Sequence, residues 1–185
     1  MVDEVLQDAT GRMDKSIEAT RHEFNTVRTG RASAALLDRI TIDYYGQQTP
    51  LKQLATVNAP EARLLTVQPF DPGSIKQIER AIQESDLGLT PSNDGKIVRL
   101  PIPQLTEERR KELVKVVRQM AEEGRVAVRN IRRDAMHHLK EAVHEGEIGD
   151  DEERRAEDRV QKLTDEHVKS IDELLKHKEA EIMEV

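Results

Sequence analysis

Cysteine is missing from the 185 residues, which excludes a disulfide framework, a thiolate zinc site and a cysteine nucleophile. Tryptophan is missing as well, and the only aromatic side chains are Phe24, Tyr44, Tyr45 and Phe70. Hydrophobic residues still make up 36% of the chain, enough for one core or two small ones. Because large rings are so few, any core must be built from aliphatic side chains and methionine.

Long apolar runs are also missing. The longest unbroken one covers only residues 34–37, far short of the about 20 residues that a membrane-spanning helix needs. Residues 1–10 (MVDEVLQDAT) carry acids where a signal peptide has a basic region followed by an apolar one. The sequence therefore predicts a cytoplasmic protein with no membrane partner.

Proline is missing from both ends of the chain, since all seven prolines lie between positions 50 and 103. A proline inside a helix costs about 3 kcal/mol, so long helices can form on both sides of this region but not within it. Apolar residues recur every three or four positions in the stretches 2–29, 106–145 and 150–182. This is the spacing of helices with one apolar face, and three such helices predict an elongated antiparallel bundle.

Glycines and capping residues delimit the predicted helices. Gly30 is expected to end the first helix, and Asp150 with Glu153 three residues later is expected to form a capping box at the start of the third. Gly124 lies within the apolar face of the second helix despite its poor helix propensity. We therefore expect close packing of the helices at Gly124.

The segment between the first two helices has a different pattern. Apolar residues alternate with polar ones from Ile40 to Tyr44, and short apolar runs occur at 64–68 and 97–100, which predicts strands. Asp71 followed by Pro72 predicts the start of a short helix. The predicted fold class is α+β, with a three-helix bundle of residues 1–30 and 105–185 and an inserted small β/α/β domain of residues 31–104.

Two connections join the predicted domains. One contains Gly30 and Arg31, and the other contains Pro103, Gln104 and Leu105. Because the helices that flank the insert pack together, the two connections are expected to lie side by side. Two short parallel connections predict a hinge.

The net charge of −7 conceals an uneven distribution. Residues 146–185 carry fourteen acids and seven bases, whereas residues 106–145 carry eight acids and ten bases. At about 100° per residue, Arg118, Arg125, Arg129 and Arg132 fall on one side of the second helix, and we call them the arginine stripe. No acid occurs between positions 124 and 133, so the stripe is expected to face solvent without acidic partners, as phosphate-binding surfaces do.

Histidines suggest one alternative function. Glu141 and His144 form an E-x-x-H pair, and His137 lies one turn before Glu141, as in half of a di-iron bundle site. The other half is missing and these side chains are expected to point away from the apolar face, so no metal site is predicted. His138 and His167 are expected at the edge of the core. No nucleotide-binding loop or nucleophile pattern is present, so no catalytic residue is predicted.

A second alternative from the residues alone is a helical scaffold protein. In that case the arginine stripe would bind an acidic protein partner. The dependence of binding on salt separates the two interpretations: about four phosphate contacts would make affinity fall steeply as salt rises, whereas a flat response would favour a hydrophobic groove of a scaffold protein.

Five motifs carry a family resemblance that covers the whole chain: residues 28–33 (RTGRAS), 44–46 (YYG), 49–51 (TPL), 105–111 (LTEERRK) and 125–135 (RVAVRNIRRDA). Together they closely resemble the bacterial ribosome recycling factors. The resemblance implies an L-shaped, monomeric translation factor that has no cofactor and binds the post-termination ribosome. With elongation factor G, which hydrolyses GTP, such a factor splits the ribosome into subunits and allows release of mRNA and tRNA.

The resemblance also implies which residues act. The family's bundle arginines contact large-subunit ribosomal RNA near the A and P sites, and they fall on Arg129 and Arg132, with Arg28, Arg125 and Arg133 as neighbours. Elongation factor G is expected to push the inserted domain, which would then move about the predicted hinge.

Overall fold

The computed structural model describes residues 1–184, and the chain divides into two compact units. The first unit contains Met1–Arg28 together with the chain from Glu107 onward, and the second contains Thr29–Thr106. Both divisions lie two residues from the positions expected from the sequence. A small unit is thus inserted between the first and second long helices.

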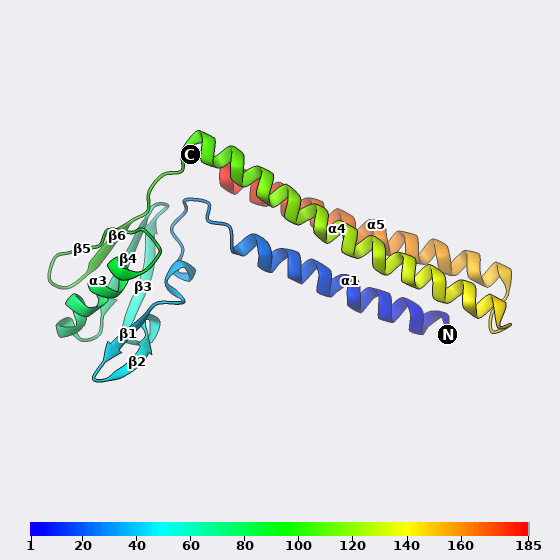
Figure 1. Cartoon of the computed structure of the whole chain (residues 1–185), viewed down its shortest axis with the longest axis horizontal. Helices are drawn as coiled ribbons and strands as arrows, with labels where there is room; N and C mark the ends of the chain where they lie inside the picture. Colours follow the sequence, from blue (N-terminus) through cyan, green and yellow to red (C-terminus); the bar gives the residue numbers. More distant parts are fainter. Residues whose placement is uncertain (185) are drawn as a thin grey trace. The chain divides into compact units, whose positions relative to one another are not determined.

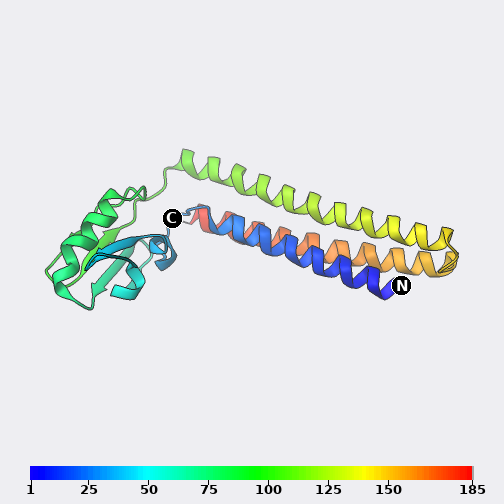
Figure 2. The same ribbon diagram turned by 60° about the horizontal axis from the view of Figure 1, so that its bottom comes forward.

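Three long helices form the first unit: α1 (Val2–Asn25), α4 (Glu107–His144) and α5 (Asp150–Met183). Each helix contacts the other two, and a short turn after α4 reverses the chain so that α5 runs antiparallel to it (Figures 1 and 2). The buried side of α4 is formed by Leu113, Val117, Ala121, Gly124, Val128, Ile131, Ala135, Leu139 and Ala142. The predicted antiparallel bundle is confirmed.

Two helix ends differ from the prediction. The first helix ends at Asn25 instead of near Gly30, and the Thr26 hydroxyl donates a hydrogen bond to the carbonyl of Glu23 at 2.6 Å. The N-cap of α5 is Gly149, whose carbonyl accepts from the amide of Glu153 at 3.0 Å, and no side chain caps this end. The predicted capping box at Asp150 is therefore wrong, because the helix begins one residue earlier than that motif requires.

The three helices approach closely at Gly124. A Cβ atom at this position would clash with the hydroxyl oxygen of Thr20 on α1 and would lie 3.2 Å from Cδ1 of Ile171 on α5. Only glycine leaves room for both neighbours. The close packing predicted for Gly124 is confirmed.

The two histidines predicted at the edge of the core differ in outcome. His167 on α5 is buried, and its Nε2 lies 2.7 Å from Oδ1 of Asp14 on α1. His138 is exposed, so its predicted position is wrong. Leu139 is fully buried in its place, because the apolar face of α4 passes one residue further along the helix than the spacing suggested.

The second unit contains two antiparallel sheets. The hairpin β1 (Thr41–Tyr44) and β2 (Gln47–Pro50) forms one. The other has the strand order β3-β4-β6-β5, with β3 (Ala55–Glu61), β4 (Leu64–Pro69), β5 (Ser92–Asn93) and β6 (Val98–Pro101). The helices are α2 (Leu51–Leu54), α3 (Ile75–Glu84) and the 3₁₀ turns Ala34–Leu37 and Pro72–Ser74. The predicted α+β class is confirmed.

Aliphatic side chains alone build the core of this unit. Ile75, Ile78 and Ile82 form the buried side of α3, and they share one cluster with inward side chains of β4 and β6 such as Leu65 and Leu100. Asp71 caps the turn before α3 as predicted, since its Oδ1 accepts from the amide of Gly73 at 3.0 Å. The scarcity of aromatic residues is thus compatible with two complete cores.

Strand β3 was not predicted because it contains Asn58 and Pro60, which are poor strand formers. It forms the edge of the four-stranded sheet and pairs only with β4, and its register shifts between Asn58 and Glu61. An edge strand with an irregularity is where proline is tolerated, because its missing N–H breaks no pairing.

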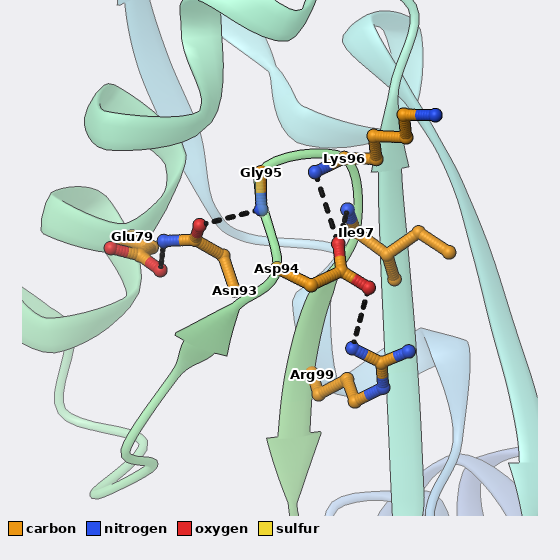
Figure 3. A network of polar contacts seen from close by, with 7 residues as sticks. All are labelled: Glu79, Asn93, Asp94, Gly95, Lys96, Ile97 and Arg99. Carbon is orange, nitrogen blue, oxygen red and sulfur yellow. Dashed lines mark hydrogen bonds and ion pairs between the residues drawn. The ribbon is translucent and has the colours of Figure 1, made fainter.

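The turn between β5 and β6 is held by the carboxylate of Asp94 (Figure 3). One oxygen accepts from the amides of Lys96 at 3.0 Å and Ile97 at 2.9 Å, and the other accepts from Nη1 of Arg99 at 2.9 Å. The amide hydrogen bonds from Ile97 and Lys96, followed by that from Arg99, lower the pKa of Asp94 to about 2 from an ordinary 3.8. The turn therefore depends on an ionised carboxylate.

We predict that Gly124→Ala destabilises the bundle by about 1–3 kcal/mol, because the added methyl group overpacks the junction of three helices. Urea unfolding measures this loss. The matched control is Gly11→Ala, which lies in α1 with nothing within 4 Å of its Cβ position and should gain up to about 1 kcal/mol of helix propensity. Equal stability of Gly124→Ala and the wild type would contradict the close packing.

We predict that the Asp94 turn loosens only in strong acid. Its folded-state pKa of about 2 lies below the ordinary 3.8, so the stabilisation is complete above about pH 4 and is lost as the pH falls through about 2. The amide resonances of Lys96 and Ile97 should report this transition by NMR. An Asp94→Asn variant should show no transition in that range, and a wild-type midpoint near pH 4 would refute the prediction.

Candidate nucleic-acid interface

Four of the five arginines that the sequence assigns to RNA binding lie on the middle of α4. These are Arg125, Arg129, Arg132 and Arg133, and α4 continues for about three turns beyond them. Arg28 lies three residues beyond the end of α1, outside any helix. The side of α4 that carries the stripe lies next to α5, because each cross-helix contact of the stripe is with a residue of α5.

Three of the four arginines of the stripe are paired with acids, so the expectation of a stripe without acidic partners is wrong for them. Nε of Arg118 lies 2.6 Å from Oε1 of Glu179, and Nε of Arg125 lies 2.8 Å from Oδ1 of Asp172. Glu122 adds a second carboxylate at 3.0 Å from Nη1 of Arg125.

Arg129 completes this network, because its Nη1 lies 3.5 Å from the same Glu122 carboxylate. The acids come from α5 and from the turn of α4 before position 124. Segment 124–133, which contains the arginines 125, 129, 132 and 133, therefore includes none of these acids.

The electrostatic surroundings of Arg118 and Arg125 differ. Arg118 has a raised pKa, first because it donates a hydrogen bond to Glu179 and second because of the charge of that carboxylate. Burial lowers the pKa of Arg125, whose side chain is only 18% exposed, but its hydrogen bonds to Asp172 and Glu122 outweigh burial and leave the pKa raised. Arg125 is therefore as much a structural residue as a surface charge.

The charges in this network cancel. Arg118, Arg125 and Arg129 contribute three positive charges, while Glu122, Asp172 and Glu179 contribute three negative ones. A neutral surface releases few counterions when it meets a phosphate chain, so it contributes little to RNA affinity.

The positive charges of two arginines are not paired with a carboxylate of residues 1–184. Nη1 of Arg132 donates to the neutral amide oxygen of Gln161 on α5 at 3.3 Å, and Arg132 makes no ion pair with residues 1–184. Arg133 is exposed and has neither a hydrogen bond nor an ion pair within the same part of the chain. Of the four candidate arginines on α4, those at positions 132 and 133 are therefore the two without a paired carboxylate in the described part of the chain.

The connections between the units lie side by side within the second unit. Gly30 has a φ of +78°, a conformation that favours glycine, and a Cβ atom there would lie 3.1 Å from Cγ of Leu105. The next residues of both connections bind the same turn between β3 and β4: the amide of Ala32 donates to the carbonyl of residue 62 at 2.7 Å, and the amide of Ile102 donates to the carbonyl of residue 63 at 2.8 Å. Arg31, Pro103 and Gln104 are exposed between these points.

The histidine cluster forms no candidate metal centre. Nε2 of His137 lies 3.0 Å from Oε1 of Glu141, and His144 is exposed at the end of α4. Residues 1–184 contain no group of three or more histidine, cysteine or acidic side chains that could hold a metal ion.

The residues that reasoning from the sequence missed are the α5 partners Gln161, Asp165, Asp172 and Glu179. Their signal is present in the sequence, because the three acids recur every seven residues and the arginines at 118, 125 and 132 do the same. Only the antiparallel packing of the two helices shows that these two series meet.

Comparisons with known proteins agree along the whole chain. The family model for "Ribosome recycling factor" matches residues 20–183. The ribosome-recycling factor of Rubrobacter xylanophilus is 62% identical over 180 residues, covering 97% of each chain. A solution structure of the ribosome recycling factor has a TM-score of 0.75 at 40% identity, covering 100% of this chain and 98% of that one.

A further structural relative is the T. thermophilus ribosome recycling factor, described with the E. coli elongation factor G bound to the E. coli post-termination complex. Its matching chain has a TM-score of 0.66 at 49% identity, with both chains covered completely.

These observations define a class of protein. It has an α+β module inserted into an antiparallel three-helix bundle, and the bundle carries arginines that are not paired with carboxylates of the described residues. The chain belongs to the ribosome recycling factor family. Its role is therefore in ribosome recycling, a step of protein biosynthesis. Among residues 1–184 no helix is both long and apolar enough to cross a membrane.

We predict that Arg125→Ala and Arg133→Ala differ in their effect on stability. Removing Arg125 leaves Asp172 and Glu122 without their shared partner and should cost about 1 kcal/mol, the upper range for a partly exposed ion pair. Removing the exposed Arg133 should change the free energy of unfolding by less than about 0.5 kcal/mol. Urea unfolding of both variants tests this, and equal losses would contradict a structural role for Arg125.

Proposed function

We propose that this protein binds the post-termination ribosome and, together with elongation factor G and GTP hydrolysis by that partner, splits the ribosome into its subunits. Messenger and transfer RNA are then released. The observation that carries this proposal is the match along the full chain to a ribosome recycling factor that is described with elongation factor G bound to a post-termination complex.

In the proposed complex the bundle binds large-subunit ribosomal RNA near the A and P sites. Arg132 and Arg133 supply the main phosphate contacts, since their charges are not cancelled by nearby carboxylates. Arg129 is partly exposed and binds phosphate when its long contact with Glu122 opens. Arg125 mainly joins α4 to α5 through its ion pair with Asp172. Arg28 adds a contact from the segment that follows α1.

The second unit receives the force from elongation factor G in this proposal. Gly30, Arg31, Pro103, Gln104 and Leu105 form the hinge, and both connections are anchored to one turn of the sheet by the amides of residues 32 and 102. A push on the sheet would therefore act on both connections at once. The bundle, held on the RNA, would transmit the strain to the contacts between the subunits.

The proposal assigns no covalent chemistry to this chain. It acts without a cofactor or a metal ion of its own, as a monomer in the cytoplasm, and GTP is used only by elongation factor G. The protein contributes by binding ribosomal RNA and by transmitting force from elongation factor G, and neither role needs a catalytic residue.

A subunit-splitting assay with purified ribosomes, elongation factor G and GTP tests the proposal, with light scattering as the readout. The wild type should split ribosomes only when all components are present. Arg132→Ala should need about tenfold more protein for half-maximal splitting, which corresponds to one lost charge-assisted contact of about 1.4 kcal/mol.

The matched control is Arg118→Ala, which removes an arginine of the same stripe whose charge is already cancelled by Glu179. It should split ribosomes like the wild type. The proposal is contradicted if the wild type leaves ribosomes intact, and the assignment of Arg132 is contradicted if Arg132→Ala is fully active.

A further inference from the structure

Arginines of α4 and acids of α5 form a regular series of cross-helix positions. Arg118 pairs with Glu179, and Arg125, seven residues later, pairs with Asp172, seven residues earlier on the antiparallel helix. One further step of the same spacing brings Arg132 to the level of Asp165. The repeat therefore predicts a third ion pair between Arg132 and Asp165.

This third ion pair does not form, and Gln161 takes its place. The amide oxygen of Gln161 accepts from Nη1 of Arg132 at 3.3 Å, while its Nε2 donates to Oδ1 of Asp165 at 2.9 Å. Gln161 lies one turn before Asp165 on α5, so it reaches both groups. The amide thus binds the carboxylate and the guanidinium at the same time.

The exchange of a carboxylate for an amide changes the charge of the site. An ion pair with Asp165 would cancel the charge of Arg132, as Glu179 and Asp172 cancel those of Arg118 and Arg125. An amide oxygen orients the guanidinium without neutralising it, and the remaining N–H groups of the planar fork stay available for a phosphate. The Asp165 carboxylate in turn accepts a hydrogen bond from Nε2 of Gln161.

We propose that Gln161 is a positioning residue for RNA binding, which holds Asp165 away from Arg132 and so leaves the charge of Arg132 unpaired and oriented toward the ribosomal RNA. This inference rests on the proposed function and deepens it, because it names the residue that makes one arginine of the stripe different from its two neighbours in the repeat. Gln161 itself does not need to touch the RNA.

The experiment measures the affinity of the full-length protein for purified large ribosomal subunits over a range of salt concentrations. Gln161→Leu keeps the size of the side chain but frees Asp165 to pair with Arg132. Affinity should fall about three- to tenfold, and the slope of log affinity against log salt should become shallower by about 1, the effect of losing one phosphate contact.

The double variant Gln161→Leu with Asp165→Asn supplies the decisive readout. It lacks the amide but also lacks the carboxylate that would capture Arg132, so affinity and salt slope should both return to wild-type values. Gln7→Leu, an exposed glutamine on α1, serves as the control for the chemical change and should bind like the wild type. Thermal unfolding checks that all variants are folded.

The outcomes separate the inference from the function on which it rests. Wild-type affinity and slope in Gln161→Leu would overturn the positioning role while leaving the proposed function intact. A double variant that stays as weak as Gln161→Leu would also overturn it, because release from Asp165 would then not explain the loss. Failure of the wild type to bind large subunits would instead count against the proposed function.

Discussion

Antiparallel packing of α5 against α4 is the constraint on which the charge of the bundle depends. Aliphatic residues on the buried sides of the two helices fix their register, and Gly124 allows them to approach closely. Once the register is set, residues seven apart on the two helices must meet, so Glu179 and Asp172 cancel Arg118 and Arg125. Of the candidate arginines on α4, Arg132 and Arg133 remain without a paired carboxylate among residues 1–184, and at Arg132 the amide of Gln161 takes the place that the same register would give to Asp165.

The second unit depends on a different constraint, the anchoring of both of its connections to one turn. Residues 62 and 63 supply adjacent carbonyls to Ala32 and Ile102, and Gly30 packs against Leu105 in a conformation that other residues rarely adopt. Arg31, Pro103 and Gln104 are exposed and lie in the two connections, whose backbone is not part of a strand or helix. Under the proposed function, these residues are where movement would be absorbed, because no regular hydrogen-bond ladder has to break.

Local signals allowed the three long helices, α3, the inserted unit and the strands β1, β4 and β6 to be predicted from the sequence, because proline position and apolar spacing act within a few residues. Strand β3 was missed because its pairing with β4 outweighs the poor strand propensity of Asn58 and Pro60. The pairing of the arginine stripe was missed for the same kind of reason: its acidic partners are far away in the sequence and become neighbours only in the bundle. Four of the five candidate arginines lie on one helix as predicted, whereas Arg28 lies beyond the end of α1; which of the four are paired with a carboxylate required the structure.

The central claim is that helix pairing, and not the number of arginines, determines which charges meet the ribosomal RNA. The most direct test compares the salt dependence of large-subunit binding for Arg132→Ala and Arg125→Ala with that of the wild type. The account predicts that the slope of log affinity against log salt becomes shallower by about 1 in Arg132→Ala and stays unchanged in Arg125→Ala. An equal change of slope in both variants would contradict it.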